Sequence, residues 1–156
     1  MRKWTYWCYP ALWMLVIFYS SSTPYQDQSM KPFLSEYVNL SFLKPVLEPI
    51  NFTYHHTTVS VESLGVNGVV EFIVRKGAHF VSFGLLALLL YIAVKKSGAV
   101  WSIAFVSSLT VTLMYAIFDE VHQGFTPNRT PFYGDVIIDV LGALFIIGCI
   151  VLGRKR

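Results

Sequence analysis

The stretch that decides the fold is SGAVWSIAFVSSLTVTLMYAIF, residues 97–118, which holds no charged side chain. A helix needs about 20 mainly apolar residues to cross the hydrocarbon core of a bilayer. This stretch reaches that length without interruption. The sequence therefore predicts a membrane-spanning helix over about residues 98–118.

Three other apolar stretches accompany this span, one on its C-terminal side and two before it. The last of them carries Asp139 as its only charge. The stretch before residue 97 is long enough to cross a bilayer only if it begins near Gly68, so that its first turns are polar. The predicted spans are residues 4–21, 69–94, 98–118 and 136–153.

The first apolar stretch has a second interpretation. Met1-Arg2-Lys3, a short apolar run and Ser20-Ser21-Ser22 together are typical of a secretory signal peptide. The small residues do not form an A-x-A pattern, however, and bulky aromatic residues lengthen the run toward the N-terminus. These two features favour an uncleaved span.

The composition agrees with a membrane protein. The chain has 156 residues, of which 54% are hydrophobic and 13% charged, whereas a soluble domain has about 25% charged residues. So little polar surface cannot coat a soluble globule. The prediction is an all-α integral membrane protein, a four-helix transmembrane bundle forming a single domain over residues 1–156. Cys8 and Cys149, both in apolar stretches, are expected to be buried, inert thiols.

A long loop, about residues 22–68, separates the first two predicted spans. Residues 32–47 place apolar side chains at nearly helical spacing, which predicts a short helix on the membrane surface. Residues 52–61 are rich in Thr, Val, Tyr and His and are expected to be extended. Residues 65–68, with a glycine at each end, are expected to break the chain before the second span.

The distribution of Lys and Arg predicts the orientation. Cytoplasmic loops carry an excess of these residues, and the short loops on one side of the predicted bundle carry only basic charges. This arrangement places both termini in the cytoplasm and the long loop outside. The inner residues are Arg2, Lys3, Lys95, Lys96, Arg154, Lys155 and Arg156, and the outer ones are Lys31, Lys44, Arg75, Lys76 and Arg129. The basic tail is an inner anchor, and no nucleic-acid partner is predicted.

Ionisable residues gather at the outer ends of the last three spans. An unpaired charge in hydrocarbon costs roughly 3 kcal/mol on insertion scales, so Asp139 and His79 are expected to point into the bundle. An arginine, Arg75 or Arg129, is a natural partner for Asp135 or Asp139 because a guanidinium can hold a carboxylate with two hydrogen bonds. The candidate ligand-binding residues are Arg75, Lys76, His79, Glu120, Gln123, Arg129, Asp135 and Asp139.

Three interpretations of this cluster stay open. The residues can be structural ion pairs that fix helix packing, a pocket that binds a polar head group, or an acid–base site. In an enzyme, His79 would be the base or acid, with Asp119 and Glu120 assisting. No HExxH or equivalent pattern fixes a metal-binding face, so no metal and no cofactor are predicted.

Three motifs in order carry a resemblance to a known family. They are VRKGAHF at residues 74–80, DEVHQGFTPNR at 119–129 and DVIIDVLG at 135–142. Together they resemble the VanZ-like family of bacterial membrane proteins, over about residues 19–148. The family pattern has Asn where this chain has Asp139, so a carboxyl replaces an amide at this position.

The resemblance implies a role in the bacterial cell envelope, with the protein in the cytoplasmic membrane as a multi-pass protein. The family takes its name from a protein associated with resistance to teicoplanin. One hypothesis is a protein that binds a lipid-linked cell-wall precursor or an anionic head group among the membrane lipids, and so lowers the access of teicoplanin-type lipoglycopeptides. The others are a membrane enzyme acting on a lipid or cell-wall precursor, and a structural assembly subunit.

Overall fold

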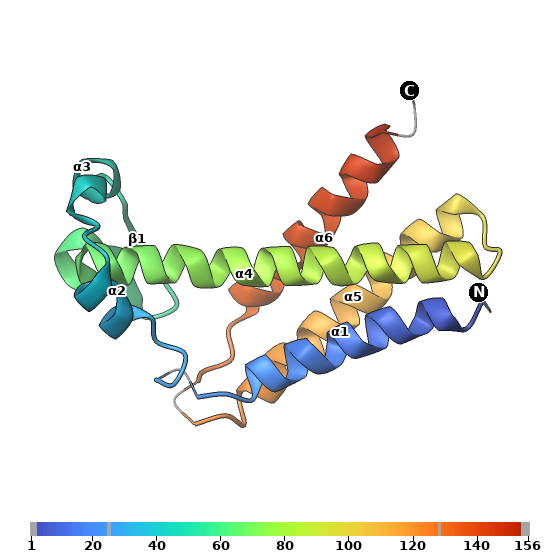
Figure 1. Cartoon of the computed structure of the whole chain (residues 1–156), viewed down its shortest axis with the longest axis horizontal. Helices are drawn as coiled ribbons and strands as arrows, with labels where there is room; N and C mark the ends of the chain where they lie inside the picture. The colour runs from blue at the N-terminus through green and yellow to red at the C-terminus, as the bar shows by residue number, and fades with distance from the viewer. Residues whose placement is uncertain (1–2, 25, 128, 154–156) are drawn as a thin grey trace. The chain divides into compact units, whose positions relative to one another are not determined.

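The structure is a computed structural model that describes residues 3–24, 26–127 and 129–153. Arg2 and the tail Arg154-Lys155-Arg156, expected as inner anchors, lie outside the described residues, as does Asn128 of the second motif. The elements in chain order are α1 (Thr5–Ser21), α2 (Lys31–Tyr37), η1 (Ser41–Leu43), α3 (Lys44–Leu47), β1 (Asn51–Tyr54), β2 (Thr57–Ser60), α4 (Val61–Lys96), α5 (Trp101–Gln123) and α6 (Tyr133–Gly153) (Figure 1).

Three helices of the described part are long and apolar enough to cross a membrane. They are α4, α5 and residues 133–150 of α6. The N-terminal helix α1 is also apolar but has 17 residues, which is about 26 Å of helix at 1.5 Å per residue. The protein is thus a mainly helical, multi-pass membrane protein. This confirms the prediction of a helical membrane protein, although β1 and β2 show that the chain is not wholly α-helical.

Helix boundaries differ from the predicted spans for two reasons: a turn can delay the start of a helix, and a helix can continue beyond its apolar part. α5 begins at Trp101, since the chain first turns at Gly98, whose φ of 105° suits a glycine. It then runs on to Gln123, so that Asp119 and Glu120 are helical residues. α6 likewise begins three residues before the predicted span, at Tyr133.

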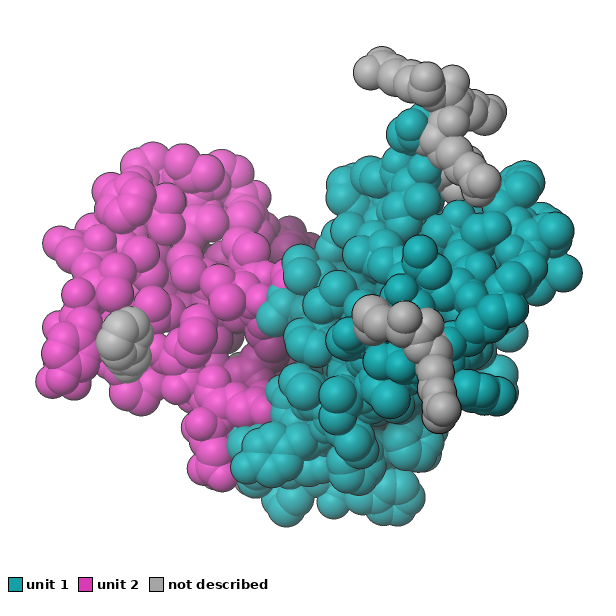
Figure 2. All heavy atoms as spheres, turned by 45° about the vertical axis from the view of Figure 1, so that its right-hand side comes forward, with its two compact units in different colours: residues 1–24, 78–156 teal, residues 25–77 magenta. Residues whose placement is uncertain are grey.

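The chain forms two compact units, which Figure 2 shows in different colours. By residue number, the boundary between them falls within α4. Unit 1 comprises residues 1–24 and 78–156, and unit 2 comprises residues 25–77. Unit 1 therefore contains α1, α5, α6 and the second half of α4. Unit 2 contains the short helices, the two strands and the first part of α4.

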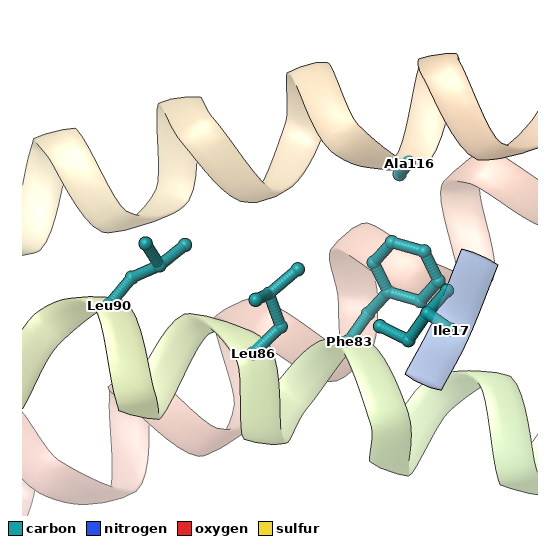
Figure 3. Packing of buried hydrophobic residues seen from close by; sticks show 5 residues of the cluster. All are labelled: Ile17, Phe83, Leu86, Leu90 and Ala116. Atoms are coloured by element: carbon teal, nitrogen blue, oxygen red, sulfur yellow. The ribbon is translucent and has the colours of Figure 1, made fainter. Parts of the chain in front are cut away.

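Side chains from three helices form the main apolar core of unit 1. Phe83, Leu86 and Leu90 project from α4, and Leu86 and Leu90 point toward α5 (Figure 3). Ile17 of α1 and Ala116 of α5 complete the cluster.

Two hydrogen bonds join α1 to the helices α4 and α5 of unit 1. The hydroxyl of Tyr115 on α5 donates to the backbone oxygen of Met14 over 2.6 Å. The indole nitrogen of Trp13 donates to the backbone oxygen of Ser82 on α4 over 2.9 Å. In an apolar surrounding each of these polar groups needs such a partner, so the bonds fix how α1 lies against α4 and α5.

The backbones of α4 and α6 approach each other closely at one glycine. A Cβ atom on Gly142 would collide with the backbone oxygen of Phe80. Gly84 lies beside the same contact, since a Cβ there would come within 3.0 Å of the Gly142 oxygen. Small residues allow membrane helices to approach in this way, and the crossing brings the first turns of α6 next to α4.

The expected buried cysteines are not found. Cys8 and Cys149 are both free, and both are exposed on the protein surface. An apolar helix in a membrane can expose such a side chain to lipid, so position in an apolar stretch does not predict burial within the protein.

Unit 2 contains more structure than a loop. Instead of one helix over residues 32–47, the chain forms α2, η1 and α3. β1 and β2 pair antiparallel through a two-residue turn, His55-His56, in which His55 has a φ of 45°. The expected break before the second span is a single non-helical residue, Gly65, whose φ of 70° a glycine adopts readily.

Candidate functional site

The predicted site residues divide between the two units. Arg75 and Lys76 belong to unit 2. Unit 1 holds the remaining predicted residues, which come from three helices and the connection between α5 and α6. These are His79, Asp119, Glu120, Gln123, Arg129, Asp135 and Asp139.

The centre of the site in unit 1 is a pair between His79 on α4 and Asp139 on α6. The Nδ1 atom of His79 lies 3.4 Å from Oδ1 of Asp139, and Asp139 is only 1% exposed. The pair is ionic when the imidazole carries both of its protons. The helix crossing explains why the two side chains meet. Phe80, which follows His79, contacts Gly142, which lies one turn after Asp139.

A second set of polar contacts begins at the C-terminal end of α5. Nε2 of Gln123 donates to Oδ2 of Asp119 over 2.8 Å, and Nη1 of Arg129 donates to the Gln123 Oε1 over 3.0 Å. Asp119 is 1% exposed and Gln123 6%. The amide of Gln123 thus links a buried carboxylate to an arginine in the following connection.

Asp119 is satisfied at one oxygen only. Its other oxygen, Oδ1, is buried and accepts no hydrogen bond from the described residues. Buried polar atoms in native proteins nearly always have a partner. Asp119 also lies within electrostatic range of Asp139, as does Asp135, so the three carboxylates belong to one site.

Glu120 fixes the connection that precedes α6. Its Oε1 accepts the backbone N–H of Phe132 over 2.6 Å, and the Phe132 oxygen in turn accepts the N–H of Asp135. Thr126 donates to the backbone oxygen of Ser21 at the end of α1. These bonds tie the connection to α5 and α1, which positions Arg129 and the start of α6.

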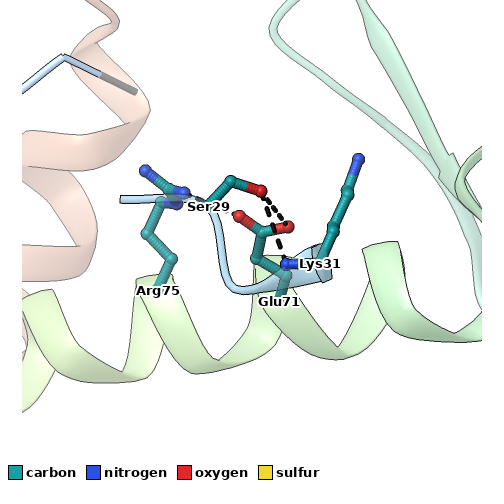
Figure 4. Close-up of polar contacts among 4 residues, drawn as sticks. All are labelled: Ser29, Lys31, Glu71 and Arg75. Atoms are coloured by element: carbon teal, nitrogen blue, oxygen red, sulfur yellow. Dashed lines mark hydrogen bonds and ion pairs between the residues drawn. The ribbon is translucent and has the colours of Figure 1, made fainter. Parts of the chain in front are cut away.

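The cations of unit 2 have partners of their own. Arg75 forms an ion pair with Glu71, with 2.9 Å between Nη2 and Oε1, and Ser29 lies 3.4 Å from the other Glu71 oxygen (Figure 4). The Lys76 ammonium lies 4.7 Å from the centre of the Tyr54 ring, within range of a cation–π interaction.

Sequence reasoning missed two features of these pairs. Glu71 was not among the predicted site residues, although its spacing of four from Arg75 is the signal for a helical ion pair. An arginine was expected beside Asp135 or Asp139, and the pairing of Asp139 with His79 was not predicted. The spacing of residues along one helix predicts local pairs, whereas the partner across helices depends on how the helices are rotated.

This arrangement of side chains can support ligand binding or acid–base catalysis. His79 and Asp139 are an imidazole and a carboxylate within reach of each other, the pairing that orients a catalytic base. Among the described residues no group of three His, Cys, Asp or Glu side chains is placed to hold a metal ion. The polar groups of the site in unit 1 are carboxylates, an imidazole, an amide and a guanidinium.

The fold and the site together define a class of protein: a multi-pass helical membrane protein with a buried polar cluster. The sequence profile described as VanZ/LLP1 matches residues 6–154, which is nearly the whole chain. The chain therefore belongs to the VanZ/LLP1 family, as its three motifs predict. No curated protein and no solved structure matches it.

The role of Gln123 as a bridge between Asp119 and Arg129 is tested by replacing its amide donor with an acceptor. Gln123→Glu places a carboxylate oxygen where Nε2 now donates to Asp119, and two acceptors then face each other. We expect this variant to lose about 1–3 kcal/mol of stability, the cost of leaving a buried polar group unsatisfied. The measurement is unfolding of the purified protein in detergent micelles.

A second substitution and a control make this test specific. Asp119→Asn in the Gln123→Glu background restores a donor between the two side chains, so stability should partly return. Gln26→Glu makes the same chemical change at an exposed position and should have little effect. A Gln123→Glu variant as stable as the wild type contradicts the bridge.

Proposed function

We propose that the protein is a cell-envelope protein whose polar cluster in unit 1 binds the head group of a lipid or lipid-linked molecule. The observation that carries this proposal is the burial of Asp119 and Asp139, each 1% exposed, on helices apolar enough to cross a membrane. Carboxylates at such positions are costly and usually belong to a binding or transport site.

The unsatisfied oxygen of Asp119 supports binding over a purely structural role. A polar network that serves only assembly is most stable when each buried atom has a partner. Oδ1 of Asp119 has none among the described residues, so the network of unit 1 is incomplete on its own. A ligand that donates a hydrogen bond would complete it.

We further propose that α1 is a fourth span and that both termini are cytoplasmic. Trp13 and Tyr115 form hydrogen bonds that join α1 to α4 and α5. Both α4 and α5 are long enough to span a membrane. Exposed Trp4 and Tyr19 lie at its two ends, where interfacial aromatic residues are expected. Lys95 and Lys96 then mark the inner side, and unit 2 and the α5–α6 connection lie outside.

Labelling of single cysteines tests this orientation. In a background with Cys8→Ala and Cys149→Ala, cysteines replace Ser97 and Thr130, which are both exposed. A membrane-impermeant maleimide should modify Thr130→Cys in intact cells and Ser97→Cys only after permeabilisation. The reverse pattern would place the site on the cytoplasmic side and contradict the proposal.

The family resemblance supports a finer function, in which occupation of the site lowers the access of teicoplanin-type lipoglycopeptides to their target in a bacterial envelope. Cells that express the protein should then bind less labelled teicoplanin than cells without it. Asp119→Asn should restore binding, because it weakens the proposed site.

The control for this experiment is Glu62→Gln, which removes a carboxylate at an exposed position of α4 and should keep the wild-type effect. Variants are compared at equal amounts in the membrane. Equal teicoplanin binding with and without the wild-type protein would contradict the proposed effect on lipoglycopeptide access. It would leave the proposed binding of a lipid head group untouched.

A membrane enzyme acting on a lipid or cell-wall precursor is the second candidate, and the His79–Asp139 pair favours it. There His79 would transfer a proton, with Asp139 orienting its ring. Deletion and overexpression would change the profile of lipids and precursors if the protein is an enzyme. An unchanged profile counts against this candidate and leaves the binding function standing.

A further inference from the structure

Residues 41–48 of unit 2 form one short helical path. η1 covers Ser41–Leu43, α3 follows at once as Lys44–Leu47, and the N–H of Glu48 donates to the backbone oxygen of Lys44 over 2.8 Å. On such a path, residues three, four or seven apart share a face. The side chains of this segment therefore form three stripes, which differ in their surroundings.

Two of these stripes lie in surroundings that suit their chemistry. The inward stripe is apolar and is buried or half-buried: Leu40, Leu43, Leu47 and Ile50. The polar stripe is exposed: Ser41, Lys44 and Glu48. Its two charged members line a hollow of unit 2 beside Asn51, Ser60 and Glu62. Packing within unit 2 thus accounts for the inward stripe, and contact with water accounts for the polar one.

The third stripe is apolar and yet exposed. We name it the apolar stripe, and it consists of Phe42, Pro45, Val46 and Pro49. Phe42 is 72% exposed and Val46 70%, about as much as Met114 on the spanning helix α5, at 66%. A single exposed apolar side chain needs no explanation, but neighbouring ones mark a surface that contacts another apolar phase. A segment that is apolar on two faces needs such a phase on both of them.

We propose that the apolar stripe lies in the interfacial layer of the membrane that anchors the protein. Unit 2 begins at Tyr25, soon after α1 ends at Ser21, and its last residues belong to α4, which is apolar enough to cross a membrane. Unit 2 is thus tethered beside a bilayer. Interfacial segments bury aromatic and aliphatic side chains such as Phe42 at the boundary between head groups and acyl chains. This inference does not rest on the polar cluster of unit 1.

The polar stripe suits the same position. Lys44 lies between Phe42 and Val46 in sequence and is exposed. A lysine stem can follow apolar surface while its ammonium stays in the polar layer, where lipid phosphates carry negative charge. The segment therefore offers apolar side chains to the acyl chains and a cation to the head groups.

A second copy of the chain fits the apolar stripe less well than lipid does. Protein interfaces of standard size bring together about 20–30 residues from each partner. The apolar stripe has four residues, and the exposed Tyr37 and Val38 nearby add two more. Apolar burial in lipid is non-directional and needs no complementary partner surface, so a small stripe is enough.

The accessibility of a spin label in vesicles tests this inference. The full-length protein with Cys8→Ala and Cys149→Ala carries one nitroxide at Pro45→Cys, in vesicles of phosphatidylethanolamine and phosphatidylglycerol. Oxygen collects in lipid and nickel-EDDA stays in water, so the ratio of their relaxation effects reports depth. Met114→Cys supplies the lipid reference, and Glu48→Cys, on the polar stripe, supplies the aqueous one. The label at Pro45→Cys should give a ratio well above that at Glu48→Cys, toward that at Met114→Cys.

Two further measurements show whether the apolar stripe itself makes the contact. Phe42→Ser and Val46→Ser in the Pro45→Cys protein should each lower the ratio of lipid-bound to water-exposed label by roughly tenfold, the effect of losing the burial of one large apolar side chain. A label at Val46→Cys keeps Pro45 in place and should give the same lipid-like ratio. The test therefore stands even if α3 needs its proline to form.

Three results would overturn the inference. A label at Pro45→Cys as accessible to nickel-EDDA as the one at Glu48→Cys places the apolar stripe in water. A label shielded from both reagents places the stripe against protein, and spectral broadening that disappears on dilution with unlabelled protein identifies a second copy there. An unchanged ratio after Phe42→Ser and Val46→Ser shows that other residues hold the segment at the membrane. None of these results bears on the proposed head-group site of unit 1, which other variants test.

Discussion

The buried carboxylate of Asp139 is the constraint on which the arrangement of unit 1 depends. A charge on a helix apolar enough to span a membrane needs a partner within the protein, because lipid offers none. His79 on α4 supplies that partner, and α6 must therefore turn this face toward α4. The crossing at Gly142 makes the approach possible, since any side chain there would meet the backbone of Phe80.

The second set of polar contacts extends this constraint to α5 and to the connection before α6. Gln123 links Asp119 to Arg129, and Glu120 holds the backbone of Phe132. The connection is thus shaped by side chains of α5, and in turn it sets where α6 begins. Packing of apolar side chains supports the helices, but polar pairs decide which faces meet, because hydrophobic burial does not distinguish protein from lipid.

Much of this could be predicted from the sequence, and the remainder depends on three-dimensional contacts. Apolar length predicted the helices, and the cost of charge in hydrocarbon predicted that His79 and Asp139 point inward. That His79 is the partner of Asp139 was not predicted, since this pairing depends on helix rotation and on the backbone approach at Gly142. The structure of residues 25–60 was only partly predicted, because η1 and the breaks around it follow local turns that hydrophobic spacing does not describe.

The central claim is that His79 and Asp139 stabilise the protein as a pair, and a double-mutant cycle in SDS-driven unfolding from mixed micelles tests it directly. His79→Leu and Asp139→Leu each leave one polar group buried without its partner, whereas the double variant leaves neither. The account predicts that the double variant is more stable than the sum of the single losses implies, by a coupling of about 0.5–3 kcal/mol. Losses that simply add would show that the two residues act independently and would contradict it.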